Sequence, residues 1–434
     1  MNELWKNAAS KVRKLFSTGF FHIFSSSVVN KIVGFLSTMI LVRILSKTEY
    51  GAYTYALNIY GIITVINGMG MDSGVLQLNS EHSGDIAYAD RVSNYGTRFG
   101  LKFDLLLVLA TIAIALFAPL KIESGRKLLC MMCLLPMFQF MTNMASCYLR
   151  GQKRNQEMAR MLIFSTLAGA AASCIGALVF REVGLIIGQY VAQTCTLILV
   201  IYALKVRYLR TGKAEIGADR KVLLKISFIS MLNNGMSQLL LLLDVFVLGI
   251  VDPQETILAS YKIATVIPSA LAFIPSCAVI YIYPYFAEHR LDKDWCLKRY
   301  KQVVIGMGGM NLLISAGLFL LAPFVIRLFF GEQYLDAVPV FRVLAVNYFF
   351  AGTFRTISGN LLVAQRKLKF NLYVGILTSC VNIVADYFFI QWWGALGAAY
   401  ATLMVVVLDS ILSTGYLVMI YKRKREEDPT LPDT

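Results

Sequence analysis

The chain has 434 residues, of which 57% are hydrophobic and 15% charged, and its mean hydropathy is +0.62. An ordinary soluble domain carries about 25% charged residues, so this composition excludes a soluble globular protein and indicates a polytopic membrane protein. The net charge of +15 does not indicate a nucleic-acid-binding protein. The basic residues cluster in short segments between apolar spans, where they set the orientation in the membrane.

The first apolar stretch, residues 20–44, is long enough to cross a bilayer and follows a basic amphipathic segment, which we expect to lie at the cytoplasmic interface. At about 100° per residue, most of its polar side chains share roughly half of a helix circumference, among them His22, Ser26, Asn30 and Lys31. A mid-membrane lysine costs about 2.5–3.5 kcal/mol, so this arc is expected to face a water-filled cavity. The alternative is that Asn30 bonds a neighbouring helix and Lys31 extends to the interface.

Apolar stretches of about 20 residues predict twelve transmembrane helices. They fall at 20–44, 51–71, 99–118, 128–149, 158–180, 183–204, 227–250, 257–282, 303–329, 338–362, 370–391 and 396–420. With the N-terminus inside, about 30 of the 41 lysines and arginines lie in the segments on the cytoplasmic side. This distribution predicts that both termini are cytoplasmic.

The longest basic linker, residues 205–225, divides the twelve spans into six and six. A weak internal repeat supports this division, because residues 45–56 align without gaps over residues 251–262. We therefore predict an all-α protein with two pseudo-symmetric six-helix lobes, residues 1–214 and 215–434. A substrate path is expected between two such parallel repeats.

The seventh and eighth spans repeat the polar design of the first span. In the seventh, the polar side chains occupy one arc, and in the eighth they fall within about 100° beside two prolines that can kink the helix. These residues predict a central cavity lined by spans 1, 2, 7 and 8, with Arg355 of the tenth span as a further candidate. The expected lining residues of spans 7 and 8 are Asn234, Ser237, Gln238, Asp244, Tyr261, Lys262, Thr265 and Ser269.

The charges inside the spans indicate the type of ligand. Lys31, Lys262 and Arg355 suit an anion such as a diphosphate, because the cost of desolvating each cation is offset when a counter-charge binds. Asp244 has two interpretations of equal weight, an ion pair with Lys262 or Lys31 and a site that couples transport to an ion gradient. For Asp409 we favour a hydrogen bond to a neighbouring helix.

Enzymatic patterns are scarce in this sequence. The three histidines, at positions 22, 82 and 289, lie in distant segments without metal-ligand spacing, and no phosphate-binding loop occurs. Cys130 and Cys133 form a C-x-x-C, but no second pair accompanies them, so they are interpreted as packing residues. We predict no catalytic residue, no metal and no cofactor apart from an ion gradient of unknown identity.

The segment VRILSKTEYGAYTYALNIYGI at 42–62 resembles the entry signature of the polysaccharide transporters within the multidrug/oligosaccharidyl-lipid/polysaccharide exporter superfamily. Arg43, Leu45, Glu49, Tyr50 and Gly51 match that pattern. The resemblance continues through YLRGQKRNQ (148–156), LDVFVLGIVDPQETILASYKIATVIP (243–268) and FFGEQYLDAVPVFRVLA (329–345).

The resemblance implies a flippase in the bacterial cytoplasmic membrane that moves undecaprenyl-diphosphate-linked oligosaccharide units of O-antigen or capsule by alternating access. It implies the lipid-linked oligosaccharide, membrane lipids and polysaccharide polymerase machinery as partners, and a monomer is expected. The related lipid II flippases carry two additional C-terminal spans, which argues against peptidoglycan precursors as the substrate. The alternatives are a cation-coupled drug exporter, which the basic cavity disfavours, and a glycan-processing enzyme or assembly scaffold.

Overall fold

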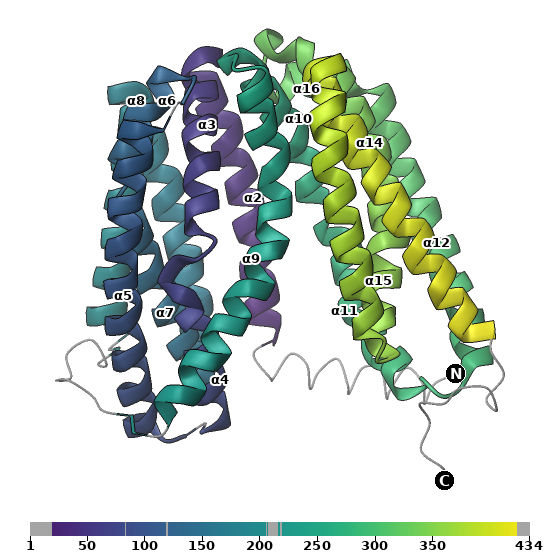
Figure 1. Ribbon diagram of the computed structural model, residues 1–434, viewed down its shortest axis with the longest axis horizontal. Coiled ribbons are helices and arrows are strands. Elements are labelled where there is room, and N and C mark those ends of the chain that lie inside the picture. Colours follow the sequence, from purple (N-terminus) through teal and green to yellow (C-terminus); the bar gives the residue numbers. More distant parts are fainter. Residues whose placement is uncertain are drawn as a thin grey trace. The chain divides into compact units, whose positions relative to one another are not determined.

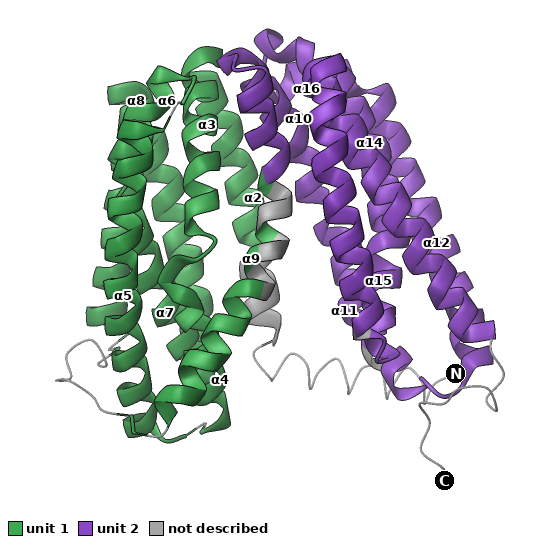
Figure 2. Ribbon diagram, viewed as in Figure 1, with its two compact units in different colours: residues 1–242 green, residues 243–434 purple. Residues whose placement is uncertain are grey.

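The computed structural model describes residues 20–82, 84–118, 120–204, 206, 216–217 and 219–422, and every regular element within these ranges is a helix. The predicted interfacial segment 1–19 and the basic tail from residue 423 lie outside the described residues. The chain forms two compact units, residues 1–242 and 243–434 (Figure 2). Each unit is a bundle of long helices that run alongside one another (Figure 1).

The first unit begins with α2 and α3, and α3 is followed by a short 3-10 segment before α4. The elements of this unit are α2 (Phe20–Ile44), α3 (Lys47–Thr64), η1 (Asn67–Gly70), α4 (Met71–Glu81), α5 (Ile86–Phe117), α6 (Glu123–Met131), α7 (Leu135–Gly151), α8 (Asn155–Ile198), the π-helical η2 (Leu199–Ala203) and most of α9 (Asp219–Val251). Its core includes Met71, Phe140, Met144 and Leu149, which are almost completely buried.

The second unit contains the end of α9 and all the following helices. These are α10 (Glu255–Leu271), α11 (Phe273–Glu288), α12 (Lys293–Leu320), α13 (Ala322–Phe330), η4 (Glu332–Ala337), α14 (Val338–Phe350), the π-helical η5 (Ala351–Arg355), α15 (Thr356–Ala364) and α16 (Leu368–Lys422). Phe286, Cys296, Leu361 and Tyr421 belong to its core.

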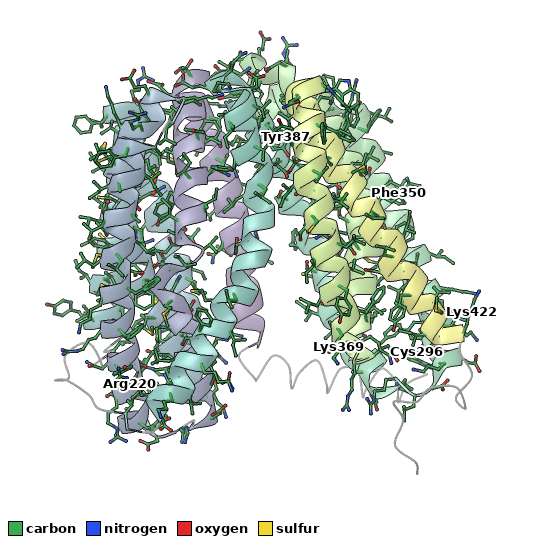
Figure 3. The ribbon with its side chains drawn as sticks, viewed as in Figure 1. Arg220, Cys296, Phe350, Lys369, Tyr387 and Lys422 are labelled. Atoms are coloured by element: carbon green, nitrogen blue, oxygen red, sulfur yellow. The ribbon has the colours of Figure 1, made fainter. Side chains whose placement is uncertain are left out.

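Two of the long helices are hairpins. In α8 the backbone is non-helical at Phe180 and Arg181, and a side chain at Gly184 would collide with the backbone of Gly176, so the two legs pack closely. In α16 the reversal is at Gly394, with φ 56° and ψ −134°, a conformation open to glycine. Figure 3 shows Lys369 and Lys422, near the two ends of α16, at the same end of unit 2, with Tyr387 towards the other.

The protein is therefore an all-helical, multi-span membrane protein. Within the described ranges, seven helical segments are long and apolar enough to cross a membrane, or eight if the bent pair α6 and α7 forms one span. Two of these segments, Asn155–Ala203 and Lys369–Lys422, contain the hairpins. Each of the twelve predicted stretches lies mostly on helical residues, with breaks such as those at residues 65–66 and 132–134.

The compact units divide at residues 242 and 243, because the first part of α9 packs on unit 1. The predicted six-helix lobes, residues 1–214 and 215–434, stay a prediction. A side chain at Gly74 of α4 would collide with Ser227 Oγ, so the absence of a Cβ there allows α9 to approach. Further along α9, Asn58 Nδ2 of α3 donates to the Leu242 carbonyl oxygen at 3.0 Å. These contacts hold α9 against unit 1 up to Leu242, so the units separate within a helix rather than in the basic linker.

Candidate functional site

The main polar cluster of unit 2 surrounds Asp244, near the end of α9. The Tyr261 hydroxyl on α10 donates to Asp244 Oδ2 at 2.8 Å, and Thr402 Oγ1 on α16 lies 2.8 Å from the same oxygen. Asn382 and Asp386, on the other leg of α16, lie within interaction range of the Asp244 carboxyl. Three helices therefore position donors and acceptors around one partly exposed carboxyl group.

Asp386 is the unusual member of this cluster. It is fully buried, and neither of its carboxyl oxygens has a hydrogen-bond partner among the residues that the structure describes. Its nearest charged neighbour is the Asp244 carboxyl, which would repel it if both were ionised. Burial of one acid beside a second without a cation is costly, so the site is suited to a proton or a small cation.

Within unit 2 the Asp244 carboxyl accepts from neutral hydroxyl groups, and the described residues of this unit include no ion pair between Asp244 and Lys262. A pairing of Asp244 with Lys31 involves both units and stays a prediction. Tyr261, which the sequence predicts to line a cavity, is 1% exposed, and its hydroxyl donates to Asp244. Its role in lining a cavity also stays a prediction.

Lys262 follows Tyr261 on α10 and is half-buried. Across the described ranges it makes no ion pair with any carboxylate. One turn further on, the Thr265 hydroxyl donates to the Lys262 carbonyl oxygen and is thus bonded to its own helix, whereas Ser269 is exposed. Lys262 is therefore a cation on an apolar helix, and no described carboxylate of unit 2 forms an ion pair with it.

Arg355 lies at the end of the π-helical segment η5 and has a partner. Its Nε is 3.0 Å from Asp409 Oδ2 on α16, and the Ser413 hydroxyl donates to Asp409 Oδ1 at 2.8 Å. The arginine side chain is 45% exposed and the aspartate 14%. π-Helical turns are frequent at functional sites. Here the turn presents the half-exposed guanidinium group of Arg355, and the more buried carboxylate of Asp409 holds it in place.

The residues predicted in the first and seventh spans are placed only in part. Lys31 is exposed on α2, and Asn30 is half-buried with an Oδ1 atom that has no partner among the described residues. Gln238 is exposed on α9. The side chains of His22, Ser26, Asn234 and Ser237 lie outside the described residues. The predicted central cavity involves both units and stays a prediction.

Asp104 in unit 1 is a buried acid that the sequence reasoning missed. Its Oδ1 accepts from the Gly68 backbone N–H at 2.7 Å, and its Oδ2 has no partner in the described structure. Gly68 lies in η1, where Gly68, Met69 and Gly70 all have positive φ angles and interrupt the helix between α3 and α4. The sequence does contain a signal for this contact. Gly68 and Gly70 form a Gly-x-Gly at the end of the second predicted span, and Asp104 is an acid within the third.

No metal centre emerges from this arrangement. Within the ranges described, no group of three or more histidine, cysteine, aspartate or glutamate side chains is placed to hold a metal ion. The eight cysteines are free, including Cys130 and Cys133, which are half-buried. The polar residues can bind anions, protons and small cations.

A model of the family described as "Polysaccharide biosynthesis protein" matches residues 40–339. Among curated proteins, a membrane protein in the cps region of Klebsiella pneumoniae is 20% identical over 91% of this chain and 80% of its own length. The lipopolysaccharide biosynthesis protein WzxC of Escherichia coli K12 is 26% identical over 37% of this chain and 32% of its own length.

Solved structures show the same fold. The lipid II flippase MurJ in an inward closed conformation aligns with a TM-score of 0.72 at 15% identity, covering 92% of this chain and 88% of that one. An inward-facing multidrug resistance MATE transporter of the MOP superfamily aligns with a TM-score of 0.69 at 15% identity, covering 91% and 94%. The family match covers more than half of the chain, and the fold is the one that these two structures share. The chain therefore belongs to the polysaccharide biosynthesis protein family, with the fold seen in the MurJ and MATE structures.

Proposed function

We propose that this protein is a flippase that translocates polyprenyl-diphosphate-linked oligosaccharide units across the bacterial cytoplasmic membrane by alternating access. Family membership supports a role in polysaccharide biosynthesis. The observation that carries the proposal is Lys262, a half-buried cation on an apolar helix without an ion-pair partner in the described residues. A lysine in that environment is stabilised when an anion binds, and the diphosphate supplies one.

Lys31 and Arg355 are proposed as further anion contacts. Lys31 is exposed on α2. The guanidinium group of Arg355 uses Nε for Asp409, and its remaining donors can take a phosphate oxygen. We also propose twelve spans in two six-helix lobes, with both termini in the cytoplasm.

The Lys262→Ala variant tests the anion site. Loss of a charge-assisted hydrogen bond costs about 1.5–3 kcal/mol, so we expect transport to fall about 10- to 100-fold. The measurement is the accumulation of lipid-linked repeat units on the cytoplasmic face, and the recovery of surface glycan, in a deletion strain that expresses each variant at equal abundance.

The matched control is Lys301→Ala, which removes an exposed lysine of α12. We expect this control to restore surface glycan fully. Normal glycan with Lys262→Ala would disprove the anion contact. Normal surface glycan in the deletion strain itself, with no other flippase present, would disprove the flippase assignment.

We further propose that the Asp244–Asp386 pair binds the ion that drives transport. The support is the burial of Asp386 beside a second carboxyl group and the neutral donors Tyr261 and Thr402 on Asp244. One bound proton or small cation removes the repulsion between the two carboxylates. Binding of the ion would therefore change the packing of α9, α10 and α16 around it.

The Asp386→Asn variant tests this coupling in proteoliposomes that contain lipid-linked oligosaccharide. An imposed proton or sodium gradient should accelerate flipping by the unmodified protein, and the variant should lose that acceleration because its amide is neutral in either state. The control is Asp294→Asn, an exposed aspartate of α12, which should respond normally. Equal responses of the two variants would exclude Asp386 from coupling.

A further inference from the structure

An apolar groove of about 380 Å³ lies on unit 2 between α12 and α14. Leu312, Ala316 and Phe319 of α12 line one side, and Val346 and Phe349 of α14 line the other. Leu312, Ala316 and Phe319 are exposed, so the groove is open to the surroundings of the helix pair. Both helices belong to segments long and apolar enough to cross a membrane.

The floor of the groove is closed by polar contacts between the two antiparallel helices. The Ser315 hydroxyl donates to the Ala345 carbonyl oxygen at 2.7 Å, and the Tyr348 hydroxyl donates to Asn311 Oδ1 at 3.1 Å. These bonds engage Ser315, Tyr348 and Asn311 between the helices, and the residues that line the groove are almost entirely apolar. An occupant of the groove must itself be apolar along this length.

One end of the groove carries a fixed cation. Arg342 Nε donates to the Phe319 carbonyl oxygen at 3.2 Å, and its guanidinium carbon lies 5.4 Å from the centre of the Phe319 ring. In unit 2, Arg327 pairs with Glu332 and Arg355 pairs with Asp409, whereas Arg342 makes no ion pair within the described residues. The Phe319 ring joins the two features, because it lines the groove and packs under the guanidinium group.

The two ends of the groove lie at different depths along the helices. Arg342 is in the second turn of α14, and Phe319 is next to the last residue of α12, so the charge lies near the helix ends. Leu312 is seven residues before Phe319, about 10 Å further along the helix. A cation near the helix ends, beside a hydrocarbon slot, matches a molecule with an anionic head and an apolar chain.

We propose that this groove is a binding site for an anionic phospholipid, with its phosphate on Arg342 and one acyl chain between α12 and α14. The guanidinium group provides donors in the planar arrangement that suits phosphate oxygens, and Phe319 restricts its movement. The site involves only unit 2, and it is independent of the proposed transport of lipid-linked oligosaccharide.

Native mass spectrometry of the full-length, delipidated protein tests the site with dioleoyl-phosphatidylglycerol as the probe. We expect Arg342→Gln to weaken its binding at least about tenfold, the factor that a charge-assisted hydrogen bond supplies. Arg327→Gln is the matched control, because it removes an arginine near the same helix ends that is already paired with Glu332. Ala316→Phe, which fills the groove from an exposed position, should weaken binding similarly.

Four results would overturn the proposal. The first is equal binding by the Arg342 and Arg327 variants, and the second is unchanged binding by Ala316→Phe. The third is equally strong binding of dioleoylglycerol, which has the chains but no phosphate. The fourth is displacement of phosphatidylglycerol by an equimolar amount of undecaprenyl phosphate, which would assign the groove to a polyprenyl lipid instead.

Discussion

Single residues in the spans are polar where they support the backbone as well as where they can bind a ligand. Asp104 shows the first use, because its Oδ1 accepts from the Gly68 N–H at the interruption between α3 and α4. Without that acceptor, a buried donor would be unsatisfied at a depth where water is scarce. The acid therefore stabilises a broken span in addition to any ionic role.

We expect Asp104→Ala to lower the free energy of unfolding by about 1–3 kcal/mol, because it leaves the Gly68 N–H without an acceptor. Asp104→Asn should cost less than half as much, because the amide oxygen can accept the same bond. Thermal unfolding of the purified variants in detergent shows whether their stabilities fall in this order, with the asparagine variant above the alanine variant. An asparagine variant as unstable as the alanine variant would show that the ionisable group, rather than the hydrogen bond, is what matters.

The sequence predicted the polar residues better than their partners. Lys262, Arg355 and Asp244 stood out because charges are rare in apolar stretches, but the Asp244 neighbour Thr402 lies 158 residues further along the chain. Residue spacing places groups on one face of a helix and does not say which other helix that face meets. Contacts between residues close in the chain are easier to predict from spacing. An example is the capping box that Ser46 and Glu49 form at the start of α3.

At the scale of helices, close backbone approach determines the shape of α8. Its two legs meet where Gly176 faces Gly184 and where Gly188 faces the backbone of Ala172. Small residues are common at helix contacts in membranes, because attraction there depends on packing rather than on the exclusion of water. The sequence predicted two spans here, separated by residues 181–182, and the structure reverses the chain at Phe180 and Arg181.

A side chain at Gly184 should therefore push the legs of α8 apart. We expect Gly184→Val to lower stability by about 1–3 kcal/mol through overpacking. Gly169→Val is the control on the same helix, because no atom lies within 4 Å of a Cβ built there. The readout is the melting temperature of each variant in the same detergent. If both variants have the same lowered melting temperature, the valine itself and not the contact between the legs causes the loss of stability.

At the scale of the whole molecule, hydropathy predicted the class, and each predicted stretch lies mostly on helical residues. The compact units divide at residues 242 and 243, whereas the predicted lobes were drawn at the basic linker 205–225. That linker is conspicuous in the sequence, and the close approach of Gly74 to Ser227 is not. The helix α9 thus begins in one unit and ends in the other. Its Asp244 is one of the two acids proposed to bind the coupling ion, and the other, Asp386, lies on α16.

The orientation in the membrane can be tested with single cysteines in a background without the eight native ones. The distribution of basic residues predicts that Lys127→Cys, on α6, reacts from the periplasm with a membrane-impermeant thiol reagent. Lys301→Cys, on α12, should react only after the membrane is permeabilised. Both positions are exposed, so burial does not explain a difference. The reverse labelling pattern would invert the proposed topology.

The reversals in α8 and α16 have a consequence for biogenesis. At Arg181 and Gly394 the chain turns within a few residues, so the translocation machinery has only a very short connection to pass across the bilayer. We expect the two legs of each hairpin to partition into lipid together, as a preassembled pair, during synthesis. A ribosome stalled after the first leg would then hold a nascent chain that is not yet integrated.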